Sequence, residues 1–402
     1  MLRGLAGMLS LWAVGAIALR SIVIPPEHCP QIDSQLARES ARASGAWIER
    51  ALQPDGTYVY EYDAPADALP DAYNVVRHAG VTMSLYQLAA EGDASVLPAA
   101  DRALAWMESN LLRHGDWAAF QDPRSGHVQL GASSLMLMSL NHRRLATGEG
   151  RYDALMREVA HFILVLQRDD GSFLNRWDPA LEAPYPAETS RYATGEAFWA
   201  LAMMHRFFPG EGWDRPARLV ADYLSLHRDE VEKNKFPPWA DQWAAYGLAE
   251  MAAWPREPAA AHHLSDANVR YAGDLSARFG FLVRAESQRT NGWWSELIHG
   301  RQVRAAGMGT WVEALTSLWR LARIDPRLGG LEAKLAERAI CGAAMLAARQ
   351  VTPAESGAYS RSSLAEGAWF TKGITRMDDQ QHALSGLIRT VAIIESRPTA
   401  GD

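Results

Sequence analysis

The segments TGEAFWALAMMHRFF (194–208), PGEG (209–212) and WDRPARLVADYLSLH (213–227) contain the pattern that decides the fold. The first is apolar almost all round and rich in small residues, as expected for a buried helix. The third carries charged residues on one face only, as expected for a helix that covers a core and faces water. The short middle segment joins the two, so we expect an inner helix followed directly by an outer one.

The same alternation runs along the chain from residue 33 onward. The amphipathic segments are 33–53, 95–112, 152–167, 213–227, 265–284 and 331–350. The apolar segments, rich in Ala, Gly and Ser, are 74–90, 131–146, 194–208, 241–254, 309–323 and 377–395. Six segments of each kind predict an all-α fold, an (α/α)6 toroid of six outer/inner helix hairpins. The small residues allow the inner helices to approach one another closely.

An open helical-repeat scaffold is the structural alternative to this ring. Here the repeat averages about 60 residues, whereas common helical-pair repeats have about 34 to 47. The excess lies in loops that lead from each outer helix to the following inner helix, which favours the ring. The chain is 48% hydrophobic and 22% charged, ordinary values for a folded body. We therefore predict one toroid domain over residues 33–402.

Residues 1–32 are predicted to be a signal peptide or signal-anchor followed by a neck. Arg3 precedes an uncharged run over 4–19, which is shorter than the ~20 residues that a spanning helix prefers. The run is consistent with a cleaved peptide, a retained anchor or a buried N-terminal helix. The first two place the body outside the cytoplasm, periplasmic or secreted, and a retained anchor would hold it at the inner membrane. Cys29 and Cys341 could pair in that compartment, although their spacing is no known framework.

Charge and motifs exclude several classes of function. The formal net charge is −7, so the chain has no basic field to concentrate nucleic acid. Phosphate-binding glycine loops and the G-x-S-x-G elbow are absent from the sequence. His262 and His263 are adjacent, which is not the i, i+4 spacing that places two ligands on one helix face. We predict no metal and no cofactor, and the oligomeric state stays open.

QPDGTYVYEYD (53–63), QRDDGSFLNRWD (167–178) and NGWWSE (291–296) resemble segments of six-hairpin toroid enzymes that act on sugars. These are glycoside hydrolases, polysaccharide lyases, and the N-acylglucosamine 2-epimerase and glucuronyl epimerase group. Terpene cyclases and lanthionine synthetases have similar turns. However, TRMDDQQH (375–382) lacks a DxDD motif, and the two cysteines cannot supply the lanthionine cyclase ligands. The resemblance therefore implies an oligo- or polysaccharide substrate.

Ionisable and aromatic residues gather at the N-terminal ends of the inner helices and in the loops before them, so we expect the site there. Singly, such acids also serve as helix caps and dipole partners. The neighbours Asp378 and Asp379 point to different helix faces, so at most one should line a cavity. The candidate catalytic residues are Glu196, Asp241, Glu313, Asp378, His78 and His382. The candidate substrate-binding residues are Asn74, Arg77, Arg191, Tyr192, Trp239, Trp293, Trp294, Trp311 and Arg376.

Four functions fit these residue types. A glycoside hydrolase needs one protonated and one ionised carboxyl group, which makes it the simplest interpretation. An epimerase would use His78 and His382 to move a proton on either side of a sugar carbon. A lyase would bind a uronate through Arg77 or Arg191, with Tyr192 or His78 as the base. A glycan-binding toroid of a surface-polysaccharide assembly system needs no catalytic pair.

Overall fold

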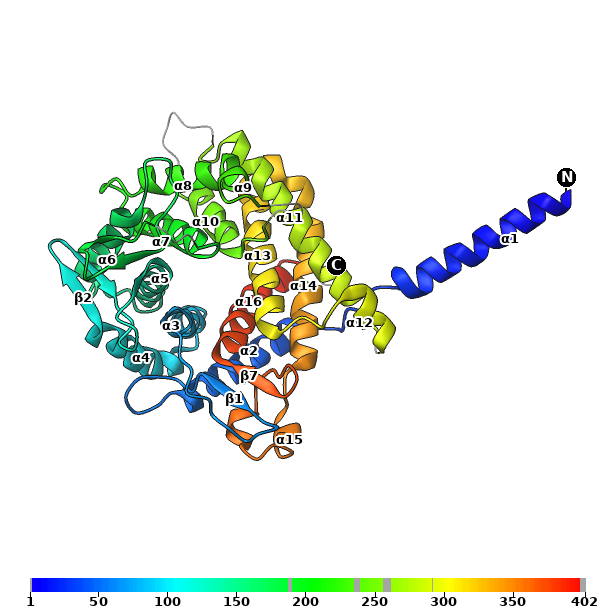
Figure 1. The fold of residues 1–402 in the computed structure, drawn as a ribbon, viewed down its shortest axis with the longest axis horizontal. Helices are drawn as coiled ribbons and strands as arrows, with labels where there is room; N and C mark the ends of the chain where they lie inside the picture. Colours follow the sequence, from blue (N-terminus) through cyan, green and yellow to red (C-terminus); the bar gives the residue numbers. More distant parts are fainter. Residues whose placement is uncertain (1, 187–189, 235–238, 256–261, 291, 398–402) are drawn as a thin grey trace.

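The computed structural model describes residues 2–186, 190–234, 239–255, 262–290 and 292–397. Within these residues, helices alternate between an outer and an inner ring (Figure 1). The outer helices are α2 (Ser34–Ala51), α4 (Leu97–Ser109), α6 (Asp153–Leu166), α8 (Asp214–Leu226), α11 (Asp266–Ser287) and α14 (Glu332–Arg349). The inner helices are α3 (Val75–Ala90), α5 (Leu130–Thr147), α7 (Ala193–Phe207), α10 (Gln242–Ala252), α13 (Ala305–Ile324) and α16 (Met377–Glu395).

The inner helices form a closed ring. They contact one another in chain order from α3 to α16, and α16 returns to contact α3. Each outer helix lies over the seam between two inner helices, as α14 does over α13 and α16. The inner helices are buried almost all round, and in α10 every residue from Gln242 to Met251 is buried. The structure thus confirms the all-α (α/α)6 toroid that the sequence predicts.

Glycines set how closely the inner helices approach. A Cβ atom at Gly309 of α13 would lie 2.3 Å from the carbonyl carbon of His382 on α16. Gly386, one turn further along α16, would place a Cβ 3.3 Å from the carbonyl oxygen of Gly309. At the α7–α10 contact, a Cβ at Gly247 would lie 2.3 Å from the ring of Phe198. These helices therefore meet backbone against backbone or against a ring face, with no room for a side chain.

Short antiparallel strands, which the sequence pattern did not indicate, order the long loops. β1 (Glu61–Asp63) pairs with β7 (Ile374–Arg376), and β2 (Leu111–His114) pairs with β3 (Trp117–Phe120). β5 (Arg176–Asp178) pairs with both β4 (Val128–Gln129) and β6 (Ala183–Pro184). Because β1 precedes the first inner helix and β7 precedes the last, their pairing joins the two ends of the ring.

The remaining elements are short and lie in connections. They are the helices α9 (Arg228–Val231), α12 (Trp293–His299) and α15 (Pro353–Ser356), with 3-10 turns η2 (Ala94–Val96), η3 (Pro326–Leu331) and η4 (Ser362–Leu364). Of these, α9 and α12 lie in the two loops that lead into α10 and α13. The residues that follow α9 line the cavity described below, whereas the residues of α12 do not.

The N-terminal segment is a helix that stands away from the ring (Figure 1). It consists of α1 (Leu2–Ala18) and the π-helical turn η1 (Leu19–Val23). Its apolar side chains are exposed, for example Leu11 and Trp12 at 75% and 77%. The interpretation as a buried N-terminal helix is therefore wrong. No helix among the described residues is both long enough and apolar enough to cross a bilayer.

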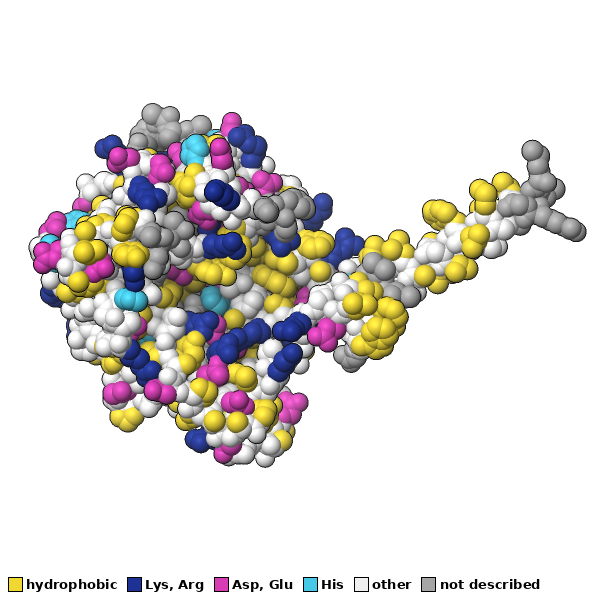
Figure 2. Space-filling model, viewed as in Figure 1, with side chains coloured by type: hydrophobic (Ala, Val, Ile, Leu, Met, Phe, Trp, Pro, Cys, Tyr) yellow, Lys and Arg dark blue, Asp and Glu magenta, His cyan; other side chains and the backbone are white. Residues whose placement is uncertain are grey.

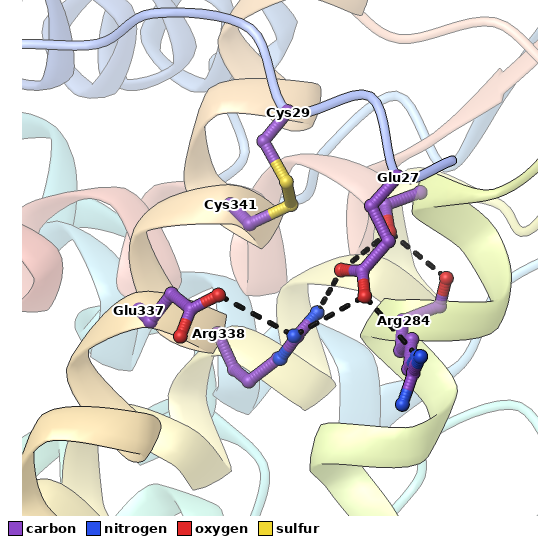
Figure 3. Close-up of a disulfide and its surroundings, with 7 residues drawn as sticks. Glu27, Cys29, Arg284, Glu337, Arg338 and Cys341 are labelled. Carbon is purple, nitrogen blue, oxygen red and sulfur yellow. Dashed lines mark hydrogen bonds and ion pairs between the residues drawn. A yellow bond between two sulfur atoms is a disulfide. The ribbon is translucent and has the colours of Figure 1, made fainter.

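The neck that follows η1 is fastened to the ring (Figure 3). Cys29 forms a disulfide with Cys341 of α14, which settles the pairing that the sequence left open. Glu27 forms ion pairs with Arg338 of α14 and Arg284 of α11. Partial burial acts to raise the pKa of Glu27, but the two guanidinium groups outweigh it and hold that pKa below its ordinary value. The neck is therefore bound by one disulfide, two ion pairs and hydrogen bonds to Ser287 of α11.

We predict that Gly309→Ala destabilises the ring, because its methyl group would have to displace the backbone of His382. Overpacking of this kind costs about 1–3 kcal/mol. The matched control is Gly273→Ala in outer helix α11, where a Cβ meets nothing within 4 Å. That substitution should stabilise the protein by up to ~1 kcal/mol through helix propensity. Thermal unfolding of both variants checks this, and equal melting temperatures would contradict the close approach of α13 and α16.

We predict that Cys341→Ser releases the neck and lowers the stability of the chain by about 2–4 kcal/mol, the usual contribution of a disulfide. Limited proteolysis should then cut residues 24–33 faster in the variant than in the parent. Arg38→Gln serves as the control, because it removes only a surface ion pair with Glu395. An unchanged rate of neck cleavage and an unchanged melting temperature would show that the disulfide neither holds the neck nor stabilises the fold.

Candidate active site

The N-terminal ends of the inner helices surround a cavity of about 1090 Å³. Every inner helix contributes to its wall, and Figure 2 shows the hollow at the centre of the ring. This is the end of the ring at which the sequence places the candidate residues. The candidates that line the cavity are Asn74, Arg77, Arg191, Tyr192, Glu196, Trp239, Trp311, Asp378 and His382.

Glu196 lies in the first turn of α7 and lines the cavity, although only 4% of the residue is exposed. Gly131 on α5 leaves space for its carboxyl group, because a Cβ there would lie 2.6 Å from Oε2. Burial raises the pKa of Glu196 to about 8, the charge of Asp241 adds to this, and His382 opposes it. Glu196 is therefore mostly protonated at neutral pH and can donate a proton to a ligand.

Asp378 and Asp379 begin α16 and point to different sides, as the sequence predicts. Asp378 lines the cavity, where its Oδ2 lies 3.3 Å from Nε of Arg77. Asp379 is buried, pairs with Arg304, and accepts a hydrogen bond from the backbone N–H of Ala306 at 3.0 Å. Burial, with the neighbouring charge of Asp378, raises the pKa of Asp379. Of the two carboxylates, Asp378 is the one that a ligand can reach.

Glu196 and Asp378 stand on opposite sides of the ring. In the order in which the inner helices contact one another, α7 is third and α16 is sixth. Two members of a six-membered ring that are three places apart face each other across its centre. The cavity thus has a carboxyl group on each of two facing walls, and a ligand between them could contact both.

His382 lines the cavity one turn after Asp378, and a carboxylate behind it holds its ring. Its Nδ1 lies 2.8 Å from Oε2 of Glu313, a fully buried residue of α13. Burial acts to lower the pKa of His382, but the charge and the hydrogen bond of Glu313 outweigh it, so the net shift is upward. Since Nδ1 donates to Glu313, Nε2 is the ring atom that remains for a ligand. Glu313 itself does not line the cavity.

Asp241 also lies behind the cavity wall. It is fully buried, forms an ion pair with Arg228, and caps α10 by accepting a hydrogen bond from the N–H of Ala244 at 3.0 Å. Gly195 packs against it, because a Cβ there would lie 2.6 Å from Oδ1. Asp241 therefore cannot touch a ligand directly. It acts on the site through its charge, which raises the pKa of Glu196.

His78 belongs to the core. It is fully buried, its Nδ1 accepts a hydrogen bond from the Tyr73 hydroxyl at 2.7 Å, and its Nε2 donates to the carbonyl of Ala103 at 3.1 Å. Burial lowers its pKa to about 3, so the ring stays neutral at physiological pH. Both ring nitrogens are occupied, and His78 does not line the cavity.

Three further candidates lie outside the cavity. Trp293 and Trp294 are stacked on α12 with 67% and 55% of their surface exposed. Asn291, the first residue of the NGWWSE motif, lies outside the described residues. Arg376 forms an ion pair with Glu61 across the β1–β7 pair. Trp239 and Trp311 are thus the candidate tryptophans that line the cavity.

Several lining residues were not singled out from the sequence, among them Trp243, Lys233 and Arg278. Trp243 stands in the first turn of α10, where an aromatic ring beside Asp241 could have been noticed. Its ring centroid lies 5.8 Å from that of His382. Arg278 comes from outer helix α11, whose charged residues a sequence pattern assigns to solvent.

Among the described residues, no group of three His, Cys, Asp or Glu side chains is arranged to hold a metal ion.

The chain matches no protein-family model, and no curated protein sequence matches it. Solved structures with the same architecture do match, among them these three. The GH76A alpha-1,6-mannanase of Salegentibacter sp. HEL1_6 gives a TM-score of 0.56 at 14% identity, covering 89% of this chain and 99% of that one. A heparin-specific unsaturated glucuronyl hydrolase gives 0.60 at 12% identity, covering 90% and 98%. The cellobiose 2-epimerase of Spirochaeta thermophila DSM 6192 gives 0.59 at 11% identity, covering 90% and 96%. At such identities the similarity establishes the shared (α/α)6 toroid.

We predict that the carboxyl group of Glu196 titrates near pH 8. Its raised pKa means that the folded state binds the proton more tightly than the unfolded state does. The contribution of this group to stability is therefore complete below its unfolded pKa of about 4.3, and it is lost as pH rises through 8. Glu196→Gln should therefore gain stability relative to the parent between about pH 5 and 9, by a few kcal/mol. Melting curves against pH test this, with exposed Glu39→Gln as the control. Parallel curves for the Glu196 variant and the parent would contradict it.

Proposed function

We propose that this protein is an extracytoplasmic glycan-processing enzyme, most simply a glycoside hydrolase whose carboxyl pair is Glu196 and Asp378. One observation carries the proposal: a buried, protonated carboxyl group and a second carboxylate line facing walls of one cavity. Hydrolysis of a glycosidic bond uses this combination of an acid and a carboxylate. The solved structures of similar fold include a mannanase and a glucuronyl hydrolase, which supports a sugar substrate.

In this mechanism Glu196 is the general acid. Its O–H donates a proton to the glycosidic oxygen while the bond from that oxygen to the anomeric carbon breaks. The leaving sugar thus departs as a neutral alcohol. Asp378 either takes a proton from the water that attacks the anomeric carbon or attacks that carbon itself, and the configuration of the product distinguishes the two. Water supplies the oxygen and the two protons that balance the reaction.

The other lining residues fit substrate positioning. The His382 ring is oriented by Glu313 and presents Nε2, so it can bond a sugar hydroxyl beside the reacting centre. Trp243 and Trp311 present aromatic surface in the cavity wall, against which a sugar face can stack. Arg77 is paired with Asp378 and keeps that carboxylate in place. These groups would hold one sugar ring between the two carboxyl groups.

The alternatives receive unequal support. An epimerase that uses His78 and His382 together is disfavoured, because His78 has both nitrogens occupied in the core. A lyase retains specific support, since Arg191 and Tyr192 both line the cavity. Burial, however, raises the pKa of Tyr192, which works against its acting as a base. A purely binding toroid would not require a protonated carboxyl group in the cavity.

The proposed extracytoplasmic location rests on two features. Most of the described apolar side chains of α1 are exposed, so a membrane or an export machinery could engage them. The Cys29–Cys341 disulfide forms and persists in oxidising compartments such as the periplasm. Both features fit a chain whose N-terminal segment directs or anchors the ring outside the cytoplasm.

We predict that the full chain cleaves a glycan from a panel that includes alpha-1,6-mannan, heparin-derived oligosaccharides and acidic bacterial exopolysaccharides. In H₂¹⁸O, each cut by hydrolysis should add one ¹⁸O atom, which mass spectrometry detects. Glu196→Gln and Asp378→Asn should each lose at least about 10²–10⁴-fold in rate, and Glu39→Gln should keep the parental rate. Products that lack one water would indicate the lyase. Unchanged masses with every glycan, at any pH from 5 to 9, would contradict both enzymes.

A further inference from the structure

Positive charge dominates the cavity wall, although the whole chain carries a net charge of −7. Four basic side chains line the cavity among the described residues, against the carboxyl groups of Glu196 and Asp378. Glu196 is mostly protonated at neutral pH, so Asp378 is the carboxylate that offsets the basic groups, and it pairs with Arg77. Figure 2 shows Lys and Arg side chains gathered beside the central hollow. The other three basic residues leave an excess of positive charge.

Arg191 is the best positioned of these three. It precedes α7 in the same loop as Tyr192, and its guanidinium carbon lies 5.1 Å from the centroid of the Trp239 ring. No carboxylate among the described residues pairs with it. A cation–π contact holds the side chain in place without neutralising its charge. The Arg191 guanidinium group therefore keeps its donors available for an anion in the cavity.

Arg278 and Lys233 reach the same cavity from neighbouring elements. Arg278 lies on α11, its Nε is buried, and that atom has no hydrogen-bond partner. Buried guanidinium nitrogens are rarely left unpaired, because losing their water shell is costly. Lys233 follows α9 and has no side-chain partner among the described residues. The helices α7 to α11 are adjacent in the ring, so the three cations belong to one sector of its wall.

We propose that this sector, formed by Arg191, Lys233 and Arg278, binds an acidic substituent of the glycan, a carboxylate or a sulfate. The inference deepens the proposed function and rests on it for the identity of the ligand as a sugar. An oxyanion there would pair with the guanidinium groups of Arg191 and Arg278, which both line the cavity. The three basic side chains would also attract an acidic glycan to the cavity, although the protein as a whole is acidic. The affinity should fall as the salt concentration rises.

Binding is measured without turnover, in a Glu196→Gln background, by titration calorimetry. The probes are tri-galacturonate against its methyl ester, a sulfated heparin tetrasaccharide against its desulfated form, and inorganic sulfate alone. We expect at least one probe to bind more than about tenfold better than the partner that lacks its carboxylate or sulfate groups, at low salt. Arg191→Gln and Arg278→Gln should each reduce that preference about tenfold. Arg151→Gln, on the connection at the opposite end of the ring, should leave it unchanged.

The outcomes separate this inference from the proposed function. Two results would overturn the anion site: equal binding of every acidic probe and its partner, or a preference for acidic probes that both arginine variants retain. Either result would do so even if the parent hydrolyses a neutral glycan. Arginine-dependent acid preference without any cleavage by the parent supports the anion site and counts against the hydrolase. A preference for tri-galacturonate over its methyl ester identifies a carboxylate as the substituent, and a preference for the sulfated tetrasaccharide over its desulfated form identifies a sulfate. Circular dichroism of each variant shows that a loss of binding is not a loss of fold.

Discussion

The close approach of the inner helices is the constraint on which the rest of the structure depends. Gly309 and Gly386 let α13 and α16 touch at the level of their backbones, and Gly247 receives the ring of Phe198 between α7 and α10. Helices packed this tightly close a small ring, and the loops above it then converge on one mouth. The same small residues decide where the acids can go, since Gly131 and Gly195 leave the space that the carboxyl groups of Glu196 and Asp241 occupy.

Burial within this ring determines the chemistry of its acidic and basic groups. Glu196 and Asp378 both belong to inner helices, but Glu196 is buried against Gly131 of α5, whereas Asp378 faces Arg77. Two carboxyl groups of one cavity thus have different surroundings, which is the condition that the proposed pairing of an acid with a base requires. Glu313 and Asp241 contribute from behind the wall, the first by orienting His382 and the second by its charge near Glu196.

The sequence predicts the twelve ring helices because their periodicity reflects burial, and burial is what the fold satisfies. It also places the candidate residues at the end of the ring where the cavity lies. It cannot separate Asp378, which lines the cavity, from Asp241, which does not, because both begin an inner helix and both suit a cap. It also misses Arg278, since a charged residue on an outer helix carries no sign that it reaches inward. Such choices depend on contacts between elements that are distant in the chain.

The fastening of the neck has a mechanical consequence. The disulfide joins residues 312 positions apart, so a pull on the N-terminal helix passes from Cys29 directly into α14. The four hairpins from α2 to α10 lie outside both attachments of the neck. The ion pairs of Glu27 with Arg284 and Arg338 spread part of the force to α11. Any tension on the N-terminal helix is thus borne by α14 and α11, whereas Arg77 on α3 and Glu196 on α7 belong to hairpins outside these attachments.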